Sequence, residues 1–184
     1  MGTGTIIVLA VLGLLVLVLI GIYNRLVVLR NRVENSWAQI DVQLKRRTDL
    51  VPNLVETVKG YVKHERGTLE AVTEARAAVM KGGSVGEQAK ANNVLTEALK
   101  SVFAVAEAYP DLKANQNFLM LQEELSGIEN KIAYARQFYN DSVLSFNQTQ
   151  QVFPANAVAG MFGFKEHEYF EAGVAEREPV KVQF

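Results

Sequence analysis

The chain has 184 residues, a formal net charge of −1 and no cysteine. The near-zero charge gives no electrostatic argument for nucleic-acid binding. The absence of cysteine excludes disulfides, thiolate catalysis and thiolate metal sites. A composition of 49% hydrophobic and 21% charged residues is typical of one globular domain plus one apolar span. Only His64 and His167 remain for histidine chemistry, and we expect no cofactor.

An apolar run without charged residues opens the chain and covers residues 6–22. With the three residues before it, the run forms about 30 Å of helix, which matches the hydrocarbon thickness of a bilayer. No Lys or Arg precedes the run and no small-x-small site ends it, which favours a retained anchor over a cleaved signal peptide or a buried core helix. We predict a transmembrane anchor at residues 1–23, with Ile6, Leu9, Leu12, Leu15, Leu19 and Ile22 as its anchor residues.

Three arginines follow this run and set its expected orientation. Arg25, Arg30 and Arg32 come shortly after the span, whereas only the α-amino group precedes it. The positive-inside rule therefore predicts a cytoplasmic C-terminal domain. A periplasmic domain is the alternative, because a chain of this size can also be exported behind an N-terminal anchor.

Residues 24–153 are predicted to form an all-α domain. Alternating β-branched runs closed by tight turns are missing, and apolar residues recur at helical spacing. We expect helices near residues 4–48, 50–81, 85–108 and 114–152. The first continues from the anchor, and together they form an antiparallel four-helix bundle with long, coiled-coil-like helices. Pro52 is expected in the first turn of the second helix, and Ser84 with Glu87 forms a predicted capping box at the start of the third.

The fourth predicted helix has the most regular pattern. Its apolar positions alternate steps of four and three over many turns, as in a heptad seam; they are Leu121, Leu125, Ile128, Ile132, Ala135, Tyr139, Ser142 and Phe146. Asparagines are also frequent within the predicted helices, and we expect some of them to form interior polar layers that fix the helix register. The candidates are Asn53, Asn92, Asn93, Asn117, Asn130 and Asn140.

Residues 154–184 are predicted to be an irregular, apolar C-terminal tail. Its apolar stretch at 158–164 is too short to span a bilayer. The tail either packs over the bundle or contacts another subunit or the membrane. The candidate self-association residues are Met161, Phe162, Phe164, Tyr169 and Phe170.

Motifs of enzymes and metal sites have simpler explanations in this chain. Residues 82–86 fit the G-x-S-x-G pattern of a hydrolase, but predicted helices flank it where a nucleophile elbow needs a preceding strand. His64 and Glu65 begin like a zinc-protease motif, yet Thr68 takes the place of the second histidine. The basic residues 45–47 are interpreted as complementing a helix C-terminus. The sequence thus predicts no catalytic residue and no metal ligand.

Several longer stretches resemble the LemA family of bacterial proteins. They include residues 31–37 (NRVENSW), 43–55 (QLKRRTDLVPNLV), 103–112 (FAVAEAYPDL) and 129–136 (ENKIAYAR), with FGF at 162–164 and YFE at 169–171 in the tail. The similarity extends over essentially all of residues 23–184. The resemblance implies a single-pass protein of the bacterial inner membrane with a helical domain and no established enzymatic activity. A family relative takes part in magnetosome membrane formation, and family members are often encoded near membrane proteases.

These features together predict a non-enzymatic scaffold that self-associates and organises or remodels the bacterial inner membrane. The alternative is a membrane-anchored adaptor that presents one bundle face to a partner membrane protein such as a protease. The expected partners are the lipid bilayer and further copies of the chain, with a partner membrane protein in the alternative and no nucleic acid.

Overall fold

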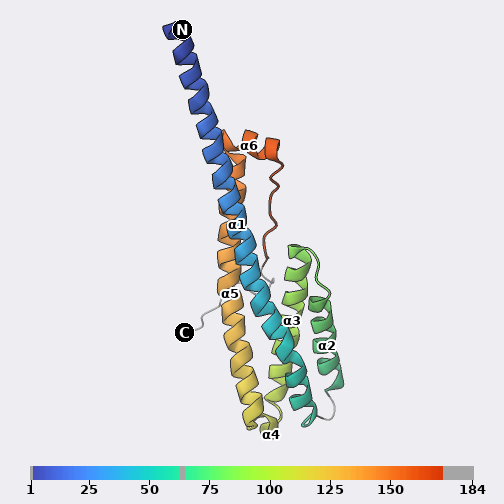
Figure 1. The fold of residues 1–184 in the computed structure, drawn as a ribbon. Helices are drawn as coiled ribbons and strands as arrows, with labels where there is room; N and C mark the ends of the chain where they lie inside the picture. The colour runs from blue at the N-terminus through green and yellow to red at the C-terminus, as the bar shows by residue number, and fades with distance from the viewer. Residues whose placement is uncertain (1, 63–64, 172–184) are drawn as a thin grey trace, which may run out of the picture. The chain divides into compact units, whose positions relative to one another are not determined.

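The computed structural model describes residues 2–62 and 65–171, and every regular element in those residues is a helix. The elements in chain order are α1 (Thr3–Lys59), α2 (Arg66–Met80), α3 (Val85–Ala106), α4 (Pro110–Lys113), α5 (Gln116–Gln151) and α6 (Ala155–Phe162) (Figure 1). The predicted all-α class is therefore confirmed.

The first helix contradicts the boundary that the sequence predicted before Pro52. The helix continues through this proline to residue 59, and the next helix starts only at residue 66. The apolar spacing explains the difference, because the buried positions Leu44 and Val51 are followed, past the proline, by Leu54 and Val58. Burying these side chains outweighs the roughly 3 kcal/mol that an interior proline costs a helix.

The predicted core stripe of α5 is confirmed. The helix covers residues 116–151, close to the expected 114–152. Within the stripe, Leu121 and Ala135 are half-buried. The other six positions are buried, namely Leu125, Ile128, Ile132, Tyr139, Ser142 and Phe146.

The predicted capping box at the start of α3 is also confirmed. The Ser84 hydroxyl accepts the Glu87 backbone N–H at 3.3 Å, and the Glu87 carboxylate accepts the Ser84 backbone N–H at 2.8 Å. These two bonds satisfy donors that the first turn of a helix otherwise leaves without partners.

The C-terminal tail is less irregular than expected, because it contains α6. This helix ends at Gly163, whose φ of 71° is a left-handed conformation that suits a residue without a side chain. The chain then runs without regular structure to residue 171, and residues 172–184 lie outside the described part.

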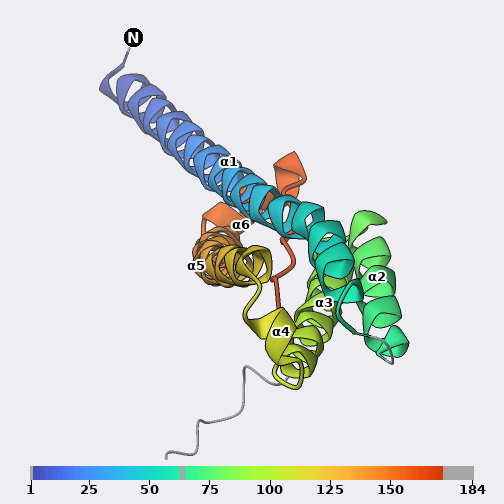
Figure 2. The same ribbon diagram turned by 90° about the horizontal axis from the view of Figure 1, so that it is seen from below.

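The chain divides into two compact units. Unit 1 contains Met1–Ala38 and Phe138–Glu168, and unit 2 contains Gln39–Gln137 and Tyr169–Phe184. In unit 1, the part of α1 that follows the apolar run packs against the last part of α5, and the ring centres of Trp37 and Tyr139 lie 5.5 Å apart there. In unit 2, α2 and α3 lie side by side (Figure 2) and bury a cluster that includes Val72, Leu95 and Leu99.

Candidate functional site

The apolar start of α1 lacks protein neighbours. The large apolar side chains from Ile6 to Ile20 are between 45% and 67% exposed. An 18-residue window of this helix has a mean hydropathy of 3.2, and none of it is buried inside the protein. By length and composition the segment can cross a bilayer. Of the six predicted anchor residues, Ile6, Leu9, Leu12, Leu15 and Leu19 lie on this exposed surface, and Ile22 is half-buried.

The three arginines that follow the span have different environments within unit 1. Arg25 is exposed. The guanidinium of Arg30 lies 5.6 Å from the ring centre of Phe164, and that of Arg32 lies 5.2 Å from the ring centre of Phe138. Such cation–π contacts contribute about 0.5–1 kcal/mol each at exposed positions. Arg30 and Arg32 therefore also hold neighbouring aromatic side chains in place.

A short extended segment, the strap (residues 163–168), is tied to α5. The side-chain amide of Asn147 donates to the backbone carbonyl of His167 and accepts the backbone N–H of the same residue, both at 3.0 Å. The Tyr139 hydroxyl donates to the backbone carbonyl of Glu168 at 2.8 Å. Because Asn147 is buried, these paired bonds give both the nitrogen and the oxygen of its amide a partner without placing a charge in the interior.

Aromatic rings hold the other end of the strap. The Phe164 ring lies 5.9 Å from that of Tyr23 and 6.2 Å from that of Phe146. Near the other end of the strap, the His167 ring meets the Phe146 ring edge-on, with 5.1 Å between the ring centres. The strap is thus fixed by one buried amide, one buried hydroxyl and several aromatic contacts.

Burial shifts the pKa of two groups at the strap. It raises the pKa of Tyr139 to about 12, with Glu168 adding to the rise. Burial also lowers the pKa of His167; the charge of Glu34 opposes this effect and that of Arg30 adds to it. Both groups are therefore held in their neutral forms around pH 7.

The five predicted self-association residues differ widely in exposure. Phe170 is only 1% exposed, and Phe164 is half-buried in the contacts of the strap. Both side chains make contacts within the single chain, and their part in self-association stays a prediction. Met161, Phe162 and Tyr169 are 77%, 58% and 41% exposed and remain available to a partner.

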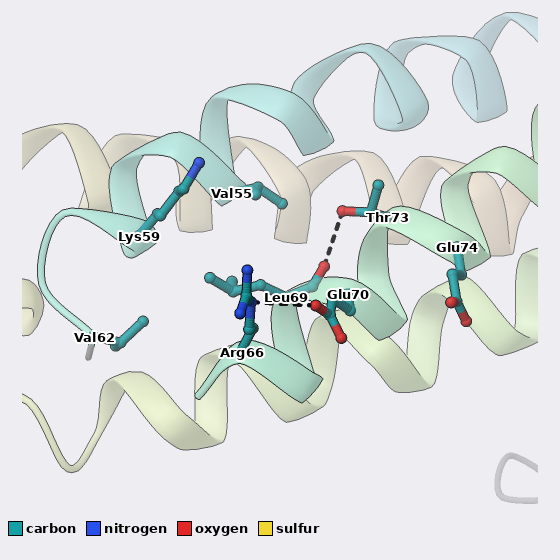
Figure 3. A pocket seen from close by; sticks show the side chains of 8 residues that line it. All are labelled: Val55, Lys59, Val62, Arg66, Leu69, Glu70, Thr73 and Glu74. Atoms are coloured by element: carbon teal, nitrogen blue, oxygen red, sulfur yellow. Dashed lines mark hydrogen bonds and ion pairs between the residues drawn. The ribbon is translucent and has the colours of Figure 1, made fainter. Parts of the chain in front are cut away.

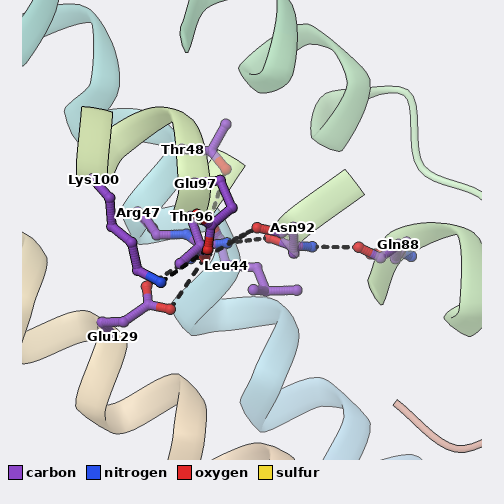
Figure 4. Close-up of polar contacts among 9 residues, drawn as sticks. All are labelled: Leu44, Arg47, Thr48, Gln88, Asn92, Thr96, Glu97, Lys100 and Glu129. Carbon is purple, nitrogen blue, oxygen red and sulfur yellow. Dashed lines mark hydrogen bonds and ion pairs between the residues drawn. The ribbon is translucent and has the colours of Figure 1, made fainter. Parts of the chain in front are cut away.

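A buried arginine joins three helices of unit 2 (Figure 4). The side chain of Arg47 is 1% exposed. It donates to Glu129 at 2.7 Å, to the Thr96 hydroxyl at 2.9 Å and to the Asn92 side-chain oxygen at 2.5 Å. The side-chain amide of Asn92 in turn donates a hydrogen bond to the backbone carbonyl of Gln88 at 2.8 Å. We call Arg47, Asn92, Thr96 and Glu129 the arginine layer.

The arginine layer corrects one interpretation and confirms another. Residues 45–47 were expected to complement a helix C-terminus, but α1 continues past them and Arg47 points into the interior instead. Asn92, in contrast, lies in a buried polar layer as the sequence predicted. The other five asparagine candidates are exposed or half-buried. Burial of the Arg47 guanidinium costs desolvation energy, although its partner Glu129 is 39% exposed, and the bonds that offset this cost favour the packing of these three helices.

The proline inside α1 has a specific compensation within unit 2. Pro52 has no N–H, so the carbonyl of Thr48, one turn earlier, lacks its helical donor. The Nε–H of Arg76, from α2, donates to this carbonyl at 3.0 Å. The interior proline thus creates an acceptor that a neighbouring helix uses.

A surface groove of about 640 Å³ lies where α1 ends and α2 begins (Figure 3). Its apolar part comes from Val55, Val62 and Leu69. Charged residues surround this part, namely Lys59, Arg66, Glu70 and Glu74, with Thr73 completing the lining. Arg66 and Glu70 pair at 3.4 Å and are largely exposed. The groove therefore offers a small apolar surface with charges of both signs at its edge.

The described residues contain no cluster of three or more histidine, aspartate or glutamate side chains that could hold a metal. The Ser84 hydroxyl is used by the capping box, which explains this residue without catalysis. His64 lies outside the described residues.

Sequence reasoning missed the arginine layer and the Asn147 clamp, by which we mean the two hydrogen bonds between the Asn147 amide and the backbone of His167. Each nevertheless has a signal in the sequence. Arg47 lies on the apolar stripe of its helix, three residues after Leu44 and four before Val51. Asn147 follows Phe146 at the edge of the α5 stripe. A charged or amide side chain on an apolar stripe predicts a buried polar contact. The sequence pattern does not identify the partner of such a side chain. Glu129, for example, lies 82 residues from Arg47 in the sequence and is brought to it only by the fold.

Comparison with known proteins gives a consistent result. The family model described as the LemA family matches residues 36–184. Protein LemA of Metamycoplasma hominis is 29% identical over 174 residues, which cover 92% of this chain and 78% of the relative. Magnetosome protein MamQ 2 of Paramagnetospirillum magneticum is 24% identical over 184 residues, which cover 86% of this chain and 68% of the relative.

Magnetosome protein MamQ of Magnetospirillum gryphiswaldense is 23% identical with the same coverage. None of these names is that of an enzyme, and the uncovered apolar start of α1 fits a membrane protein. The stretches that carry the sequence resemblance also contain Pro52 and the paired residues Arg47 and Glu129 of unit 2. Because the family model matches most of its length, the chain belongs to the LemA family.

Proposed function

We propose that this protein is a non-enzymatic, membrane-anchored scaffold that self-associates and organises the bacterial inner membrane. Its helical domain lies on the cytoplasmic side in this proposal, because Arg25, Arg30 and Arg32 follow the span and no basic side chain precedes it. The relatives named as magnetosome proteins support a role at a membrane.

The observation that carries this proposal is the composition of α1. One helix contains both the uncovered apolar span and core positions of both units, such as Val33 in unit 1 and Leu54 in unit 2. The anchor is therefore part of the same secondary-structure element as the domain core, with no loop between them. A protein whose anchor only tethered an independent domain would need no such continuity.

A face of α5 in unit 2 suits contacts between copies. Met120 and Tyr134 are 68% and 76% exposed, which is unusual for large apolar side chains. They lie two heptads apart and so share a face of the helix, with Gly127 midway between them. A side chain at Gly127 would meet nothing within 4 Å, so this face is open to close approach by another helix. We assign self-association to this face.

The absence of native cysteine makes a direct test simple. In membranes of cells that express Tyr134→Cys, a short bifunctional thiol reagent should cross-link two copies, because parallel packing of α5 brings this position next to itself. Lys131→Glu in the same background should weaken cross-linking if the face is correct. Glu70→Cys, exposed on α2, is the matched control and should stay monomeric. Equal yields at the two positions would contradict the proposal.

The groove between α1 and α2 favours a second candidate function, an adaptor for a partner membrane protein. The groove has a small apolar floor and a rim of mixed charge. This arrangement is typical of a protein–protein interface, which has an apolar core and a polar rim. An adaptor would use this groove while self-association is dispensable.

Charge reversal at the rim separates the two candidates. Arg66→Glu together with Lys59→Glu should leave cross-linking through position 134 unchanged if the protein is a scaffold. If the adaptor is correct, these changes should abolish co-purification of a specific membrane protein, while Tyr134→Asp should leave that co-purification intact.

A further inference from the structure

An uncharged apolar patch occupies one end of unit 1. Val152, Phe153, Met161 and Phe162 are 58%, 86%, 77% and 58% exposed, and we call them the apolar patch. The sequence has no charged residue from Ser142 to Phe164, a stretch that includes all of α6. Exposed aromatic side chains without nearby charge are unusual on a surface that faces water.

The position of this patch relative to the anchor is fixed within unit 1. The Phe162 ring lies 4.8 Å from the ring of Tyr23, which directly follows the last residue of the apolar span. Because Tyr23 marks the level at which α1 leaves the hydrocarbon, Phe162 lies at the same level. Tyrosine is itself a residue that favours this boundary.

The orientation of α6 agrees with that level. The helix runs crosswise to the first half of α1 (Figures 1 and 2), so a bilayer crossed by α1 would have α6 along its surface. The inner face of α6 buries Ala155, Val158 and Ala159, whereas the residues of the apolar patch remain exposed.

Charged residues are placed at the edges of this region rather than within it. Arg25 is exposed two residues after Tyr23, and Lys165 is exposed directly after the strap begins. Cationic side chains at that depth meet the phosphate groups of lipids, whereas aromatic side chains beside them meet the upper part of the acyl chains.

We propose that α6 and the apolar patch are an interfacial membrane anchor, embedded in the leaflet from which α1 emerges. Residues 152–162 thus form a second membrane contact beside the transmembrane span. Lipid, rather than a second copy of the chain, is the assigned occupant because the patch is continuous with the end of the span through Tyr23 and Phe162. The inference rests on the membrane anchoring in the proposed function, but not on self-association.

Depth-dependent fluorescence quenching on the full-length protein tests this assignment. The protein would carry a single cysteine labelled with an environment-sensitive dye, in vesicles of phosphatidylcholine and phosphatidylglycerol. The test positions are Met161→Cys and Phe153→Cys. Asp141→Cys is the aqueous control, since it is exposed on α5 of unit 1 about 15 Å before that helix ends. Leu12→Cys, in the span, reports anchoring itself.

The proposal expects dyes at positions 161 and 153 to be quenched several-fold more strongly by lipids with a nitroxide near the headgroup than the dye at position 141. It also expects protection of both from aqueous iodide. Iodide quenching at 161 equal to that at 141 would overturn it. Protection from both quenchers would also overturn it, because the patch would then be covered by protein. Failure of anchoring would appear separately, as absent lipid quenching at position 12.

Discussion

The two units of the chain use opposite kinds of polar residue in their interiors. The buried polar side chains of unit 1 are all neutral among the described residues, namely Ser36, Ser142, Asn147 and Gln150. Unit 2 instead buries the charged Arg47 and pairs it with Glu129. Neutral amides cost less to remove from water than a guanidinium, but they also bind less strongly once paired.

This contrast matches what each unit holds together. In unit 1, a neutral amide holds the strap on α5, and a ring contact between Phe162 and Tyr23 joins α6 to the end of the span. In unit 2, a charged fork fastens three helices that come from distant parts of the sequence. A charge fixes a specific helix arrangement because any other arrangement would leave it without partners. We therefore expect unit 2 to depend more strongly on single polar residues than unit 1.

The largest effect is expected from Arg47→Ala. The change leaves the polar groups of Asn92, Thr96 and Glu129 without their common donor and creates a cavity, which should lower the free energy of unfolding by about 3–5 kcal/mol. Denaturant unfolding in detergent, followed by circular dichroism, measures it. The matched control Arg46→Ala removes an exposed neighbour and should change the free energy by at most about 0.5 kcal/mol. If the two variants lost similar amounts of unfolding free energy, the arginine layer would not be a main source of the stability of unit 2.

A smaller effect is expected from Arg76→Met, which removes the donor to the Thr48 carbonyl. The loss should be about 1.5–3 kcal/mol, as for a hydrogen bond from a charged group. Pro52→Ala restores a helical N–H to the same carbonyl, so the loss from Arg76→Met should shrink by about 1 kcal/mol in that background. Additive losses in the double-mutant cycle would show that Arg76 and Pro52 are independent.

In unit 1, Asn147→Ala removes both bonds between the amide and the backbone of His167. We expect a loss of about 1–2 kcal/mol that is local to the strap. Amide hydrogen exchange at residues 163–168 should become faster, while exchange in the helices of unit 2 stays unchanged. The exposed neighbour Gln148→Ala is the control. Unchanged exchange in the strap would mean that the aromatic contacts alone hold it.

The smallest effect is a pH dependence of the strap. Because the pKa of His167 is lowered in the folded protein, the unfolded chain binds its proton more readily. The stabilisation that depends on neutral His167 is therefore fully present above the ordinary histidine pKa of about 6.5, and it decreases as the pH falls below that value. Strap exchange, corrected for the intrinsic rate, should increase between about pH 6.5 and pH 5. His167→Gln should abolish this dependence, and Glu34→Gln should enlarge it, since Glu34 favours the charged form.

Much of this fold could be predicted from local sequence, because heptad spacing and capping are local properties. The α5 stripe, the Ser84 capping box and the all-α class were predicted on that basis. The same reasoning gave too much weight to Pro52 as a boundary. Its cost is local, whereas the burial of Leu54 and Val58 and the compensating bond from Arg76 depend on tertiary contacts that a sequence pattern does not contain.

The candidate contact residues were less predictable than the core. The sequence places Phe164, Phe170, Met161 and Phe162 in one apolar tail with no sign of which are covered. The folded chain decides this, since Phe170 is 1% exposed whereas Met161 is 77% exposed. The geometry of the Asn147 clamp sets the path of the strap, and that geometry depends on two segments 20 residues apart.

The central claim, self-association at the membrane, is tested most directly by molar mass. Light scattering after size exclusion would give the protein mass of the full-length chain in detergent micelles, with the detergent contribution subtracted. The account predicts a uniform assembly of several chains, and a reduction to fewer chains for Tyr134→Asp combined with Met120→Asp. A single chain at all protein concentrations, for the wild type as for this variant, would contradict the scaffold.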